Sequence, residues 1–434
     1  MPKLAILGGQ KLRAEKFPPY NVIGPEEEEA VREVIGTGVL SKFLGAWHED
    51  FYGGPQVRAF EEEWASFFGA RHAVAVNSAT SGLYAAIGAL GIGPGDEVIV
   101  SPYTMSASSV APLIYNAVPV FADIEEDYFC LSAASIESRI TPRTKAIVIV
   151  DIFGQPYDAD AINTLARKHG LKIIEDCAQA PAAKHGGKWA GTLGDIGVYS
   201  LNYHKHVHTG EGGVLVTDDD ETAERLRLIR NHAEAVVESK GFATLVNMVG
   251  FNYRMTEIEA AIGRQQLKKL PDLVARRREN VSYISGKLAE IPCIKPAPVR
   301  PGTIHSYYLH ALKFDSESAG VHRNRFIEAV KAELPLTERR EKEGVKIGCG
   351  YLKPLYLQPV YQQRTAFGSG GCPWTCEKYS GNPDYSKGSC PVTERMYEQE
   401  LFTHELMHPG MTRRDMDDFI EAFRKVWENR GELV

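Results

Sequence analysis

The stretch Lys172-Ile-Ile-Glu-Asp176-Cys-Ala-Gln179 joins a short apolar run to a pair of acidic residues. A run of this length bounded by polar residues is typical of a buried β-strand. Residues 159–169, just before it, have helical period and predict a helix that leads into the strand. Segments of these two kinds alternate along the first half of the chain, which predicts an α/β fold with parallel strands and crossover helices.

The same pattern places further elements on both sides of this stretch. Strands are expected at residues 72–76, 97–101, 118–122, 146–150 and 197–200. Helices are expected at residues 25–35, 57–68, 78–90, 132–140 and, near the end, 413–427. A long amphipathic segment covers residues 256–288. We place a domain boundary inside it, between a large domain of residues 1–270 with a mostly parallel sheet flanked by helices and a smaller C-terminal α/β domain of residues 271–434.

Composition narrows the class of protein. The chain has 434 residues, a formal net charge of −7 and scattered basic residues, so we expect two domains and no nucleic-acid partner. No apolar stretch is long enough to span a bilayer, and the N-terminal apolar run is shorter than a signal-peptide core. Seven cysteines, an odd number, argue against a secreted disulfide framework. We therefore expect a cytoplasmic protein without a membrane partner.

Three loops follow predicted strands, and ligands of open parallel sheets bind where such loops meet. Residues 77–82 open a helix, whose free N–H groups favour a phosphate. Asp176 ends one strand, and Lys205 lies just beyond another, 29 residues later (205 − 176 = 29). An amine can form a Schiff base with an aldehyde, and a carboxylate can keep a pyridine nitrogen protonated. This combination predicts a pyridoxal 5'-phosphate site.

Several stretches in this order give the chain a specific resemblance to a known family. They are Gly91-Ile-Gly-Pro-Gly-Asp-Glu-Val-Ile-Val, Thr141-Pro-Arg-Thr-Lys-Ala-Ile, Ile174-Glu-Asp-Cys-Ala-Gln-Ala, Thr209-Gly-Glu-Gly-Gly and Gly250-Phe-Asn-Tyr-Arg-Met-Thr-Glu. The chain resembles the DegT/StrS family of pyridoxal-phosphate-dependent sugar aminotransferases over nearly its whole length. The resemblance implies an aspartate-aminotransferase-like fold.

The resemblance also implies roles around the cofactor ring. Lys205 would form the Schiff base and later move the proton between cofactor and substrate carbons, and Asp176 would pair with the ring nitrogen. Gln179 would contact the ring or its 3-oxygen. Met105 stands where the family usually has a stacked aromatic ring, and a thioether can still pack there.

Other residues are implied to hold the cofactor phosphate. Ala79, Thr80 and Ser200 would do so through backbone and hydroxyl groups. Asn252 would reach the phosphate of the neighbouring subunit, so that a homodimer with shared active sites is the minimal unit.

The reaction that the resemblance implies is ping-pong transamination. An amino acid, glutamate or glutamine, would give its nitrogen to the cofactor, which would pass it to a nucleotide-linked keto sugar or to a cyclitol ketone. Residues 40–52 and 350–356 are expected to wall the substrate pocket.

One alternative is a dehydratase, because a related subgroup replaces the lysine with histidine and keeps the cofactor as an amine. Here the position five residues before Gly210 is Lys205 itself (210 − 205 = 5), which favours transamination. His204, His206 and His208 flank it and alternate as strand residues would, so they could share a face as ligands. Ring stacking or hydrogen bonding is the favoured use.

A second alternative is a zinc peptidase, because His404-Glu405-Leu-Met-His408 has the metalloprotease spacing. That mechanism needs a continuous helix, and Pro409 disfavours a helical conformation at His408. Four cysteines could also close a zinc site, but they lack a Cys-x-x-Cys pair: Cys349, Cys372, Cys376 and Cys390. We predict no metal.

Overall fold

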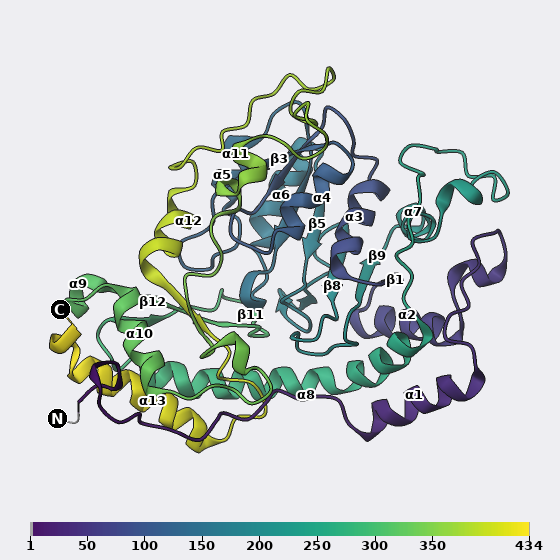
Figure 1. The fold of residues 1–434 in the computed structure, drawn as a ribbon. Helices are drawn as coiled ribbons and strands as arrows, with labels where there is room; N and C mark the ends of the chain where they lie inside the picture. Colours follow the sequence, from purple (N-terminus) through teal and green to yellow (C-terminus); the bar gives the residue numbers. More distant parts are fainter. Residues whose placement is uncertain (1–2, 434) are drawn as a thin grey trace.

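A computed structural model describes residues 3–433. Its centre is a seven-stranded sheet (Figure 1) in which six strands run in one direction and one strand near the edge is reversed. The strand order is β1 (His72–Val76), β9 (Gly213–Thr217), β8 (Ile196–Ser200), β5 (Lys172–Asp176), β4 (Thr144–Val150), β2 (Glu97–Val100) and β3 (Val118–Phe121). β9 is antiparallel to both of its neighbours. The mostly parallel sheet predicted from the sequence is confirmed.

Helices bury both faces of this sheet. On β2, Val98 and Val100 contribute to one core and Ile99 to another, as the two-residue period of a strand requires. The first core includes α3 (Ala79–Ala89), α4 (Ala107–Ile114) and α7 (Asp220–Arg230). The second includes α5 (Ala133–Arg139) and α6 (Ala159–His169). Burial on both faces explains why these strands read as continuous apolar runs.

A long helix, α8 (Glu257–Leu288), runs beneath the sheet (Figure 1) and joins two cores. Thr256 caps its start with a hydroxyl that accepts from the Glu259 N–H. Leu267 packs with α2 (Pro55–Phe68) against the large sheet, whereas Ile284 packs in a separate core. α1 (Pro25–Thr37) lies along α8. The predicted boundary at 270/271 therefore falls inside a continuous helix, and the division into two domains stays a prediction.

The separate core is built around a second sheet, which is antiparallel throughout. Its strand order is β10 (Ile294–Pro296), β12 (His310–Phe314), β14 (Leu401–His404) and β13 (Ile347–Cys349). Three helices accompany it: α9 (Ser316–Ala319), α10 (Arg323–Glu333) and α13 (Arg413–Glu428). The helix predicted at residues 413–427 is thus present.

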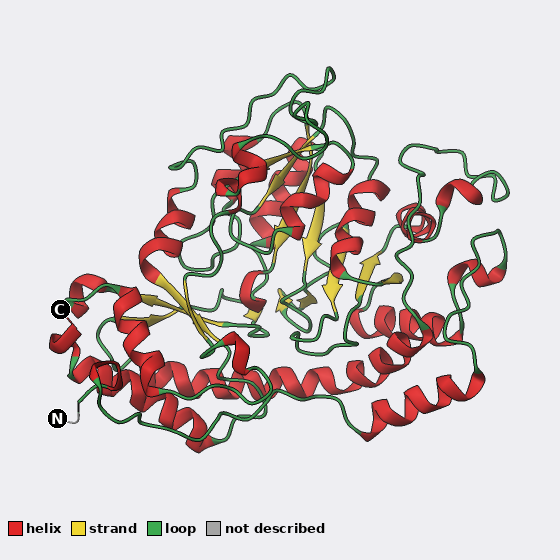
Figure 2. Cartoon of the chain, viewed as in Figure 1, coloured by secondary structure: helices red, strands yellow, loops and turns green. Residues whose placement is uncertain are grey.

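Residues 355–390 leave the second sheet and return to the first (Figure 2), where they form mostly loop with η6 (Leu355–Leu357) and α11 (Pro359–Gln362). Tyr361, Trp374 and Tyr385 belong to the same core as the large sheet. The Tyr385 hydroxyl donates to the Pro119 carbonyl of the edge strand β3 at 2.6 Å. This segment covers the edge of the large sheet, and α12 (Pro391–Arg395) follows it.

The remaining elements are short. A three-stranded sheet has the order β11 (Thr303–Ile304), β6 (Lys184–His185) and β7 (Lys188–Trp189). Single helical turns are η1 (Ala5–Leu7), η2 (Glu49–Tyr52), η3 (Ile152–Gly154), η4 (Ala233–Ala235), η5 (Glu341–Glu343), η7 (Met396–Glu400) and η8 (Arg430–Leu433). Among residues 3–433, no helix combines the length and the apolar character that crossing a bilayer requires.

Candidate active site

A cavity of about 210 Å³ opens where β5 and β8 end and α3 begins. Seven of the eight site residues predicted from the sequence line it: Ala79, Thr80, Met105, Asp176, Gln179, Ser200 and Lys205. The eighth, Asn252, does not. The cavity lies at the carboxyl edge of the parallel strands, where a ligand site of this fold class is expected.

Lys205 lies in the loop after β8, and its side chain is buried. Its backbone N–H donates to the Asn202 carbonyl at 2.9 Å, and its Nζ lies 4.2 Å from the centre of the Tyr308 ring. Burial lowers the pKa of Lys205 to about 8, while the nearby Asp176 carboxylate acts in the opposite direction. A substantial share of the amine is therefore neutral near neutral pH and able to act as a nucleophile.

Asp176, the last residue of β5, is held by two donors. The Ser108 hydroxyl donates to Oδ2 at 2.7 Å, and the Ala178 N–H donates to Oδ1 at 3.1 Å. Burial raises the pKa of this carboxyl above its usual value, while both hydrogen bonds and Lys205 act to lower it. A carboxylate fixed in this way at the cavity wall can pair with a cationic ring nitrogen.

The amide of Gln179 is fixed at both ends. Its Oε1 accepts from the Phe153 N–H at 2.8 Å, and its Nε2 donates to the Tyr351 hydroxyl at 3.1 Å. Tyr351 belongs to the loop that was predicted to wall the pocket, and it brings the later part of the chain to this site. Met105 lies at the cavity with 58% of its side chain exposed, so its thioether is free to pack on a ligand.

The start of α3 forms the other end of the cavity. The Ser78 hydroxyl caps the helix by accepting from the Ser81 N–H at 3.1 Å, and Ala79 and Thr80 form its first turn. Gly213 of β9 lets the strand approach this turn, because a Cβ added there would lie 2.6 Å from the Ala79 nitrogen. Free N–H groups and the helix dipole at this point favour an anion such as a phosphate.

The histidines beside Lys205 do not lie on a strand, so the alternative in which their alternation lets them share a face as ligands is not supported. The segment is a loop in which His206 donates from Nε2 to the Ser306 carbonyl at 3.0 Å. The Nδ1 of His208 accepts from the Gly210 N–H at 3.3 Å. His204 lines the cavity, and burial together with Lys205 lowers its pKa to about 4. Each histidine ring thus has different neighbours. This arrangement suits separate hydrogen bonds rather than the joint binding of one ligand.

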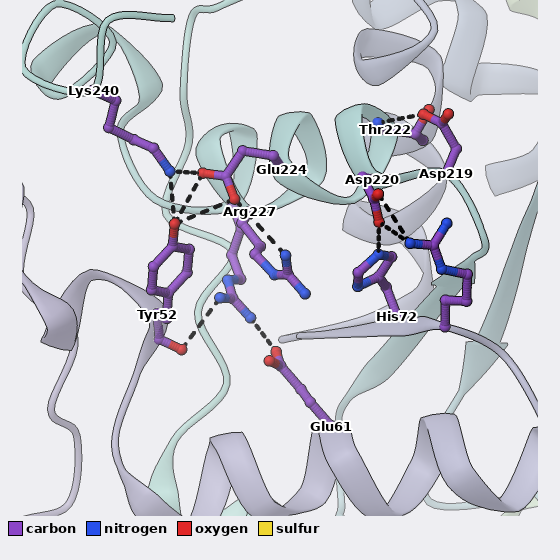
Figure 3. Close-up of polar contacts among 11 residues, drawn as sticks. Tyr52, Glu61, His72, Asp219, Asp220, Thr222, Glu224, Arg227 and Lys240 are labelled. Atoms are coloured by element: carbon purple, nitrogen blue, oxygen red, sulfur yellow. Dashed lines mark hydrogen bonds and ion pairs between the residues drawn. The ribbon is translucent and has the colours of Figure 1, made fainter.

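The loop at residues 40–52 does not line this cavity of its own chain, so the expectation that it walls the substrate pocket stays a prediction. Polar contacts hold it against α7 and the segment beyond it (Figure 3). The Tyr52 hydroxyl donates to Glu224 Oε1 at 3.1 Å and accepts from Lys240 Nζ at 2.6 Å. Asn231 Nδ2 donates to the Leu44 carbonyl at 2.8 Å.

Asn252 lies on the exposed surface near this loop. Its backbone carbonyl accepts from Asn77 Nδ2 at 3.4 Å. Asn252 also forms an isolated antiparallel β-bridge with Asn231. The Asn252 side chain is thus exposed and does not line the cavity of its own chain, so its role at a cofactor phosphate stays a prediction.

The geometry of a zinc peptidase is absent. His404 ends the strand β14, and its Nε2 is 2.8 Å from Nδ1 of His310, while His408 lies in the following turn. The two histidines therefore do not share a helix face. Across the described part of the chain, no three of the residues Cys349, Cys372, Cys376 and Cys390 lie close enough to share a metal ion.

A buried acidic pair, which sequence reasoning missed, lies behind Asp176. Asp151 and Glu175 are fully buried next to Cys177. Glu175 Oε2 accepts from the Leu193 and Gly194 N–H groups, which supports its charged form. Burial and the charge of Glu175 raise the pKa of Asp151 far above its usual value, so the pair holds a proton on Asp151.

Comparison with known proteins agrees with this geometry. Residues 45–424 match the DegT/DnrJ/EryC1/StrS aminotransferase family. Spore coat polysaccharide biosynthesis protein SpsC of Bacillus subtilis is 35% identical over 418 residues, covering 94% of this chain and 97% of that protein. A putative L-glutamine:3-amino-2,3-dideoxy-scyllo-inosose aminotransferase of Streptoalloteichus tenebrarius is 34% identical over 438 residues, covering 99% of each.

A solved structure extends the likeness to three dimensions. The aminotransferase from Psychrobacter cryohalolentis superposes with a TM-score of 0.80 at 28% identity, over 95% of this chain and 99% of that one. The fold and the site define an enzyme of the aminotransferase class with the aspartate-aminotransferase-like fold. The chain belongs to the DegT/DnrJ/EryC1/StrS aminotransferase family.

Proposed function

We propose that this protein is a pyridoxal-phosphate-dependent aminotransferase in which Lys205 is the Schiff-base lysine. The amino group passes from glutamate or glutamine to a nucleotide-linked keto sugar or a cyclitol ketone. The observation that carries the proposal is one cavity that joins a buried amine of lowered pKa, a fixed carboxylate and a free helix start.

The residues present suit this cofactor. When bound, pyridoxal phosphate supplies an aldehyde for a covalent link to an amine and a ring that accepts electrons from the substrate carbon. Asp176, oriented by Ser108, keeps the proton on the ring nitrogen. The first turn of α3 with Thr80, together with Ser200, binds the phosphate. Gln179 contacts the ring or its 3-oxygen, and Met105 packs on the ring.

Lys205 has two tasks, nucleophile and proton carrier. With the cofactor bound, the neutral Nζ would hold it through a covalent link, and the same nitrogen would be placed to move a proton between the reacting carbons. The Tyr308 ring beside Nζ limits where the amine can lie. The presence of lysine rather than histidine here supports transamination over the dehydratase alternative.

The acceptor class rests on the relatives. One carries the name of a cyclitol aminotransferase that uses glutamine, and another that of a polysaccharide biosynthesis protein. These names support a ketone of the sugar or cyclitol type for this chain.

The proposal includes a homodimer in the cytoplasm. Asn252 reaches the cofactor phosphate of the neighbouring subunit, and the loop at residues 40–52 lies against the neighbour's pocket. Support comes from exposed apolar side chains on the loop at residues 40–52 and in the segment just before Asn252, where water is an unfavourable environment: Leu40, Leu44, Trp47, Val246 and Val249. Seven free cysteines support a reducing compartment.

Absorbance spectroscopy tests the cofactor. We expect the purified protein to take up pyridoxal phosphate and to gain a visible band; borohydride reduction should remove this band and fix the cofactor covalently to Lys205. Lys205→Ala should lose the covalent link, whereas Lys188→Ala, a matched change at an exposed position, should keep it. A wild-type protein that takes up no cofactor would refute the proposal. Amine transfer from glutamate and glutamine to a panel of keto sugars and cyclitol ketones then identifies both substrates.

A further inference from the structure

A second cavity lies next to the one that holds Lys205. The two share His204, and Tyr308, whose ring covers the Lys205 amine, lines the second one as well. Its free space is about 20 Å³, room for one water-sized or ion-sized occupant. The wall of this second cavity also includes Tyr20, Arg277, Thr337 and His408.

Arg277 is a buried cation without an acidic partner. Only 4% of the residue is exposed, and within residues 3–433 no carboxylate forms an ion pair with it. Nη1 donates to the Tyr307 carbonyl at 3.1 Å, and the guanidinium lies 4.7 Å from the centre of the Tyr20 ring. Its Nε has no hydrogen-bond partner. Because buried charges in proteins are normally paired, this arrangement calls for an anion.

Two more side chains in the wall offer unused donors. His408 Nδ1 accepts from the Gly410 N–H at 3.2 Å, which places the proton of the neutral ring on Nε2. That Nε2, like the Thr337 hydroxyl, is buried without a partner. Three side chains around one small cavity thus each present a buried donor that lacks a well-formed hydrogen bond among the described residues, and the Pro18 backbone also lies near the His408 ring.

The charges around the cavity leave a net positive balance. Arg340 pairs with Glu343 at 2.6 Å and with Glu405 at 2.5 Å, and Lys346 also pairs with Glu343. Burial lowers the pKa of His408 to about 3, so that ring is neutral at neutral pH. With Arg277, the wall and the ion-pair partner Glu343 behind it hold three cations and two carboxylates.

We propose that this cavity binds one small monovalent anion, held by Arg277, Thr337 and His408. A chloride ion and a carboxylate group of the substrate offer the same acceptor chemistry, and the free volume favours the ion. An anion in the cavity next to that of Lys205 also favours the protonated amine. Occupancy therefore links the halide concentration to the protonation of Lys205. The site itself does not depend on the proposed transamination.

Diffraction from crystals grown in sodium bromide tests the site without reference to activity. We expect an anomalous peak within hydrogen-bonding distance of Arg277 Nε. It should disappear in Arg277→Gln and remain in Arg278→Gln, a matched change at the exposed neighbouring position. A wild-type crystal in which the cavity holds only a water molecule at high bromide would overturn the proposal.

Solution measurements keep the test independent of crystal packing and of a poorly folded variant. Chloride-35 NMR line broadening should show at least about tenfold weaker binding in Thr337→Val, because a lost hydrogen bond to a charged group costs about 1.5–3 kcal/mol. Glutamate added to bromide crystals distinguishes the two possible anions. Displacement of the bromide peak would identify the cavity as a site for a substrate carboxylate, and its retention would identify it as a site for the halide ion. Cofactor uptake, measured in parallel, reports on the proposed function separately.

Discussion

At the scale of single residues, burial lowers the pKa of Lys205 although the neighbouring Asp176 opposes this change. Burial is the larger influence and lowers its pKa, whereas Asp176 acts to raise it. The result, a pKa of about 8, keeps the amine available both as nucleophile and as proton carrier. Chemistry at this position therefore depends on the walls of the cavity as much as on the charged pair.

The rate at which the cofactor-free protein captures pyridoxal phosphate should follow this pKa. The neutral amine is the reacting form, so the rate should rise with pH and level off above about pH 8. Stopped-flow absorbance over a range of pH measures it.

Asp176→Asn provides the control, because removal of the neighbouring carboxylate takes away an influence that raises the pKa of Lys205. The midpoint should move to lower pH in this variant. A profile that follows an unperturbed lysine in both proteins would contradict the role of burial.

Asp151→Asn should stabilise the protein at pH 8 or leave its stability unchanged. The folded state raises the pKa of Asp151, so it binds a proton that the unfolded chain releases, and stability falls as pH rises above the unfolded value near 4. An amide reproduces the protonated carboxyl and removes this pH dependence. Urea unfolding at pH 5 and pH 8 measures both effects.

The contrasting variant is Asp151→Ala. It leaves the Tyr157 N–H, which donates to Asp151 Oδ1 at 2.9 Å, without its acceptor. We expect a loss of about 1–3 kcal/mol in the free energy of unfolding at both pH values. Equal losses in the two variants would show that Asp151 is charged in the folded protein.

Sequence alone brought together the residues that carry motifs, and missed those that carry none. Short recognisable stretches next to strand ends contain Lys205, Asp176 and the start of α3. Ser108 and Tyr308 come from distant parts of the chain and meet the site only through tertiary packing. No local pattern marks such residues, because their task is to contact another residue.

At the scale of elements, the strands and helices with strong periodicity were predicted within a few residues. β9 was not predicted, although its Val-Leu-Val run resembles the other strands. The glycines just before this run are typical of a turn. In the segment 203–208, alternation left a shared histidine face as an alternative, which the structure does not support. Its alternation is short, and the contacts of His206 and Lys205 with distant or local carbonyls fix a loop instead.

Gly213→Ala should weaken phosphate binding in particular. The added Cβ would lie 2.6 Å from the Ala79 nitrogen, so the first turn of α3 must shift. We expect the Kd for pyridoxal phosphate to rise about tenfold or more, since a charged hydrogen bond at a helix start is worth about 1.5–3 kcal/mol. Titration of the cofactor-free protein measures it.

Two controls accompany this measurement. Pyridoxal, which lacks the phosphate, should lose much less affinity in Gly213→Ala. Gly286→Ala changes a helical glycine with open space around it and should leave both affinities unchanged. Equal losses for pyridoxal and its phosphate would assign Gly213 to general folding rather than to the anion end of the cavity.

At the scale of the whole molecule, the active site of each chain is expected to be incomplete without a partner. Asn252 and the loop at residues 40–52 lie outside their own cavity, next to exposed apolar side chains. The expectation comes from the family resemblance and not from local sequence pattern, because a residue that acts in another subunit has the same local pattern as one that acts in its own.

Mixed dimers test the shared site. Lys205→Ala and Asn252→Ala homodimers should each be impaired. A heterodimer contains one site with both native residues, so unfolding and refolding an equal mixture should restore about a quarter of wild-type activity, half of the dimers having one intact site of two. Absence of recovery, with dimers present by analytical ultracentrifugation, would mean that Asn252 acts within its own chain.

The return of residues 355–390 to the large sheet has a consequence for synthesis of the protein on the ribosome. The edge strand β3 is complete early, yet Tyr385, which donates to its Pro119 carbonyl, is made only after more than half of the chain has followed. Until then the nascent sheet presents an uncovered edge, the kind of surface on which chains pair wrongly. Closure of this edge is thus a long-range step that cannot occur before residue 385 is made, and chaperones that shield unfinished sheet edges have much of the translation time in which to act.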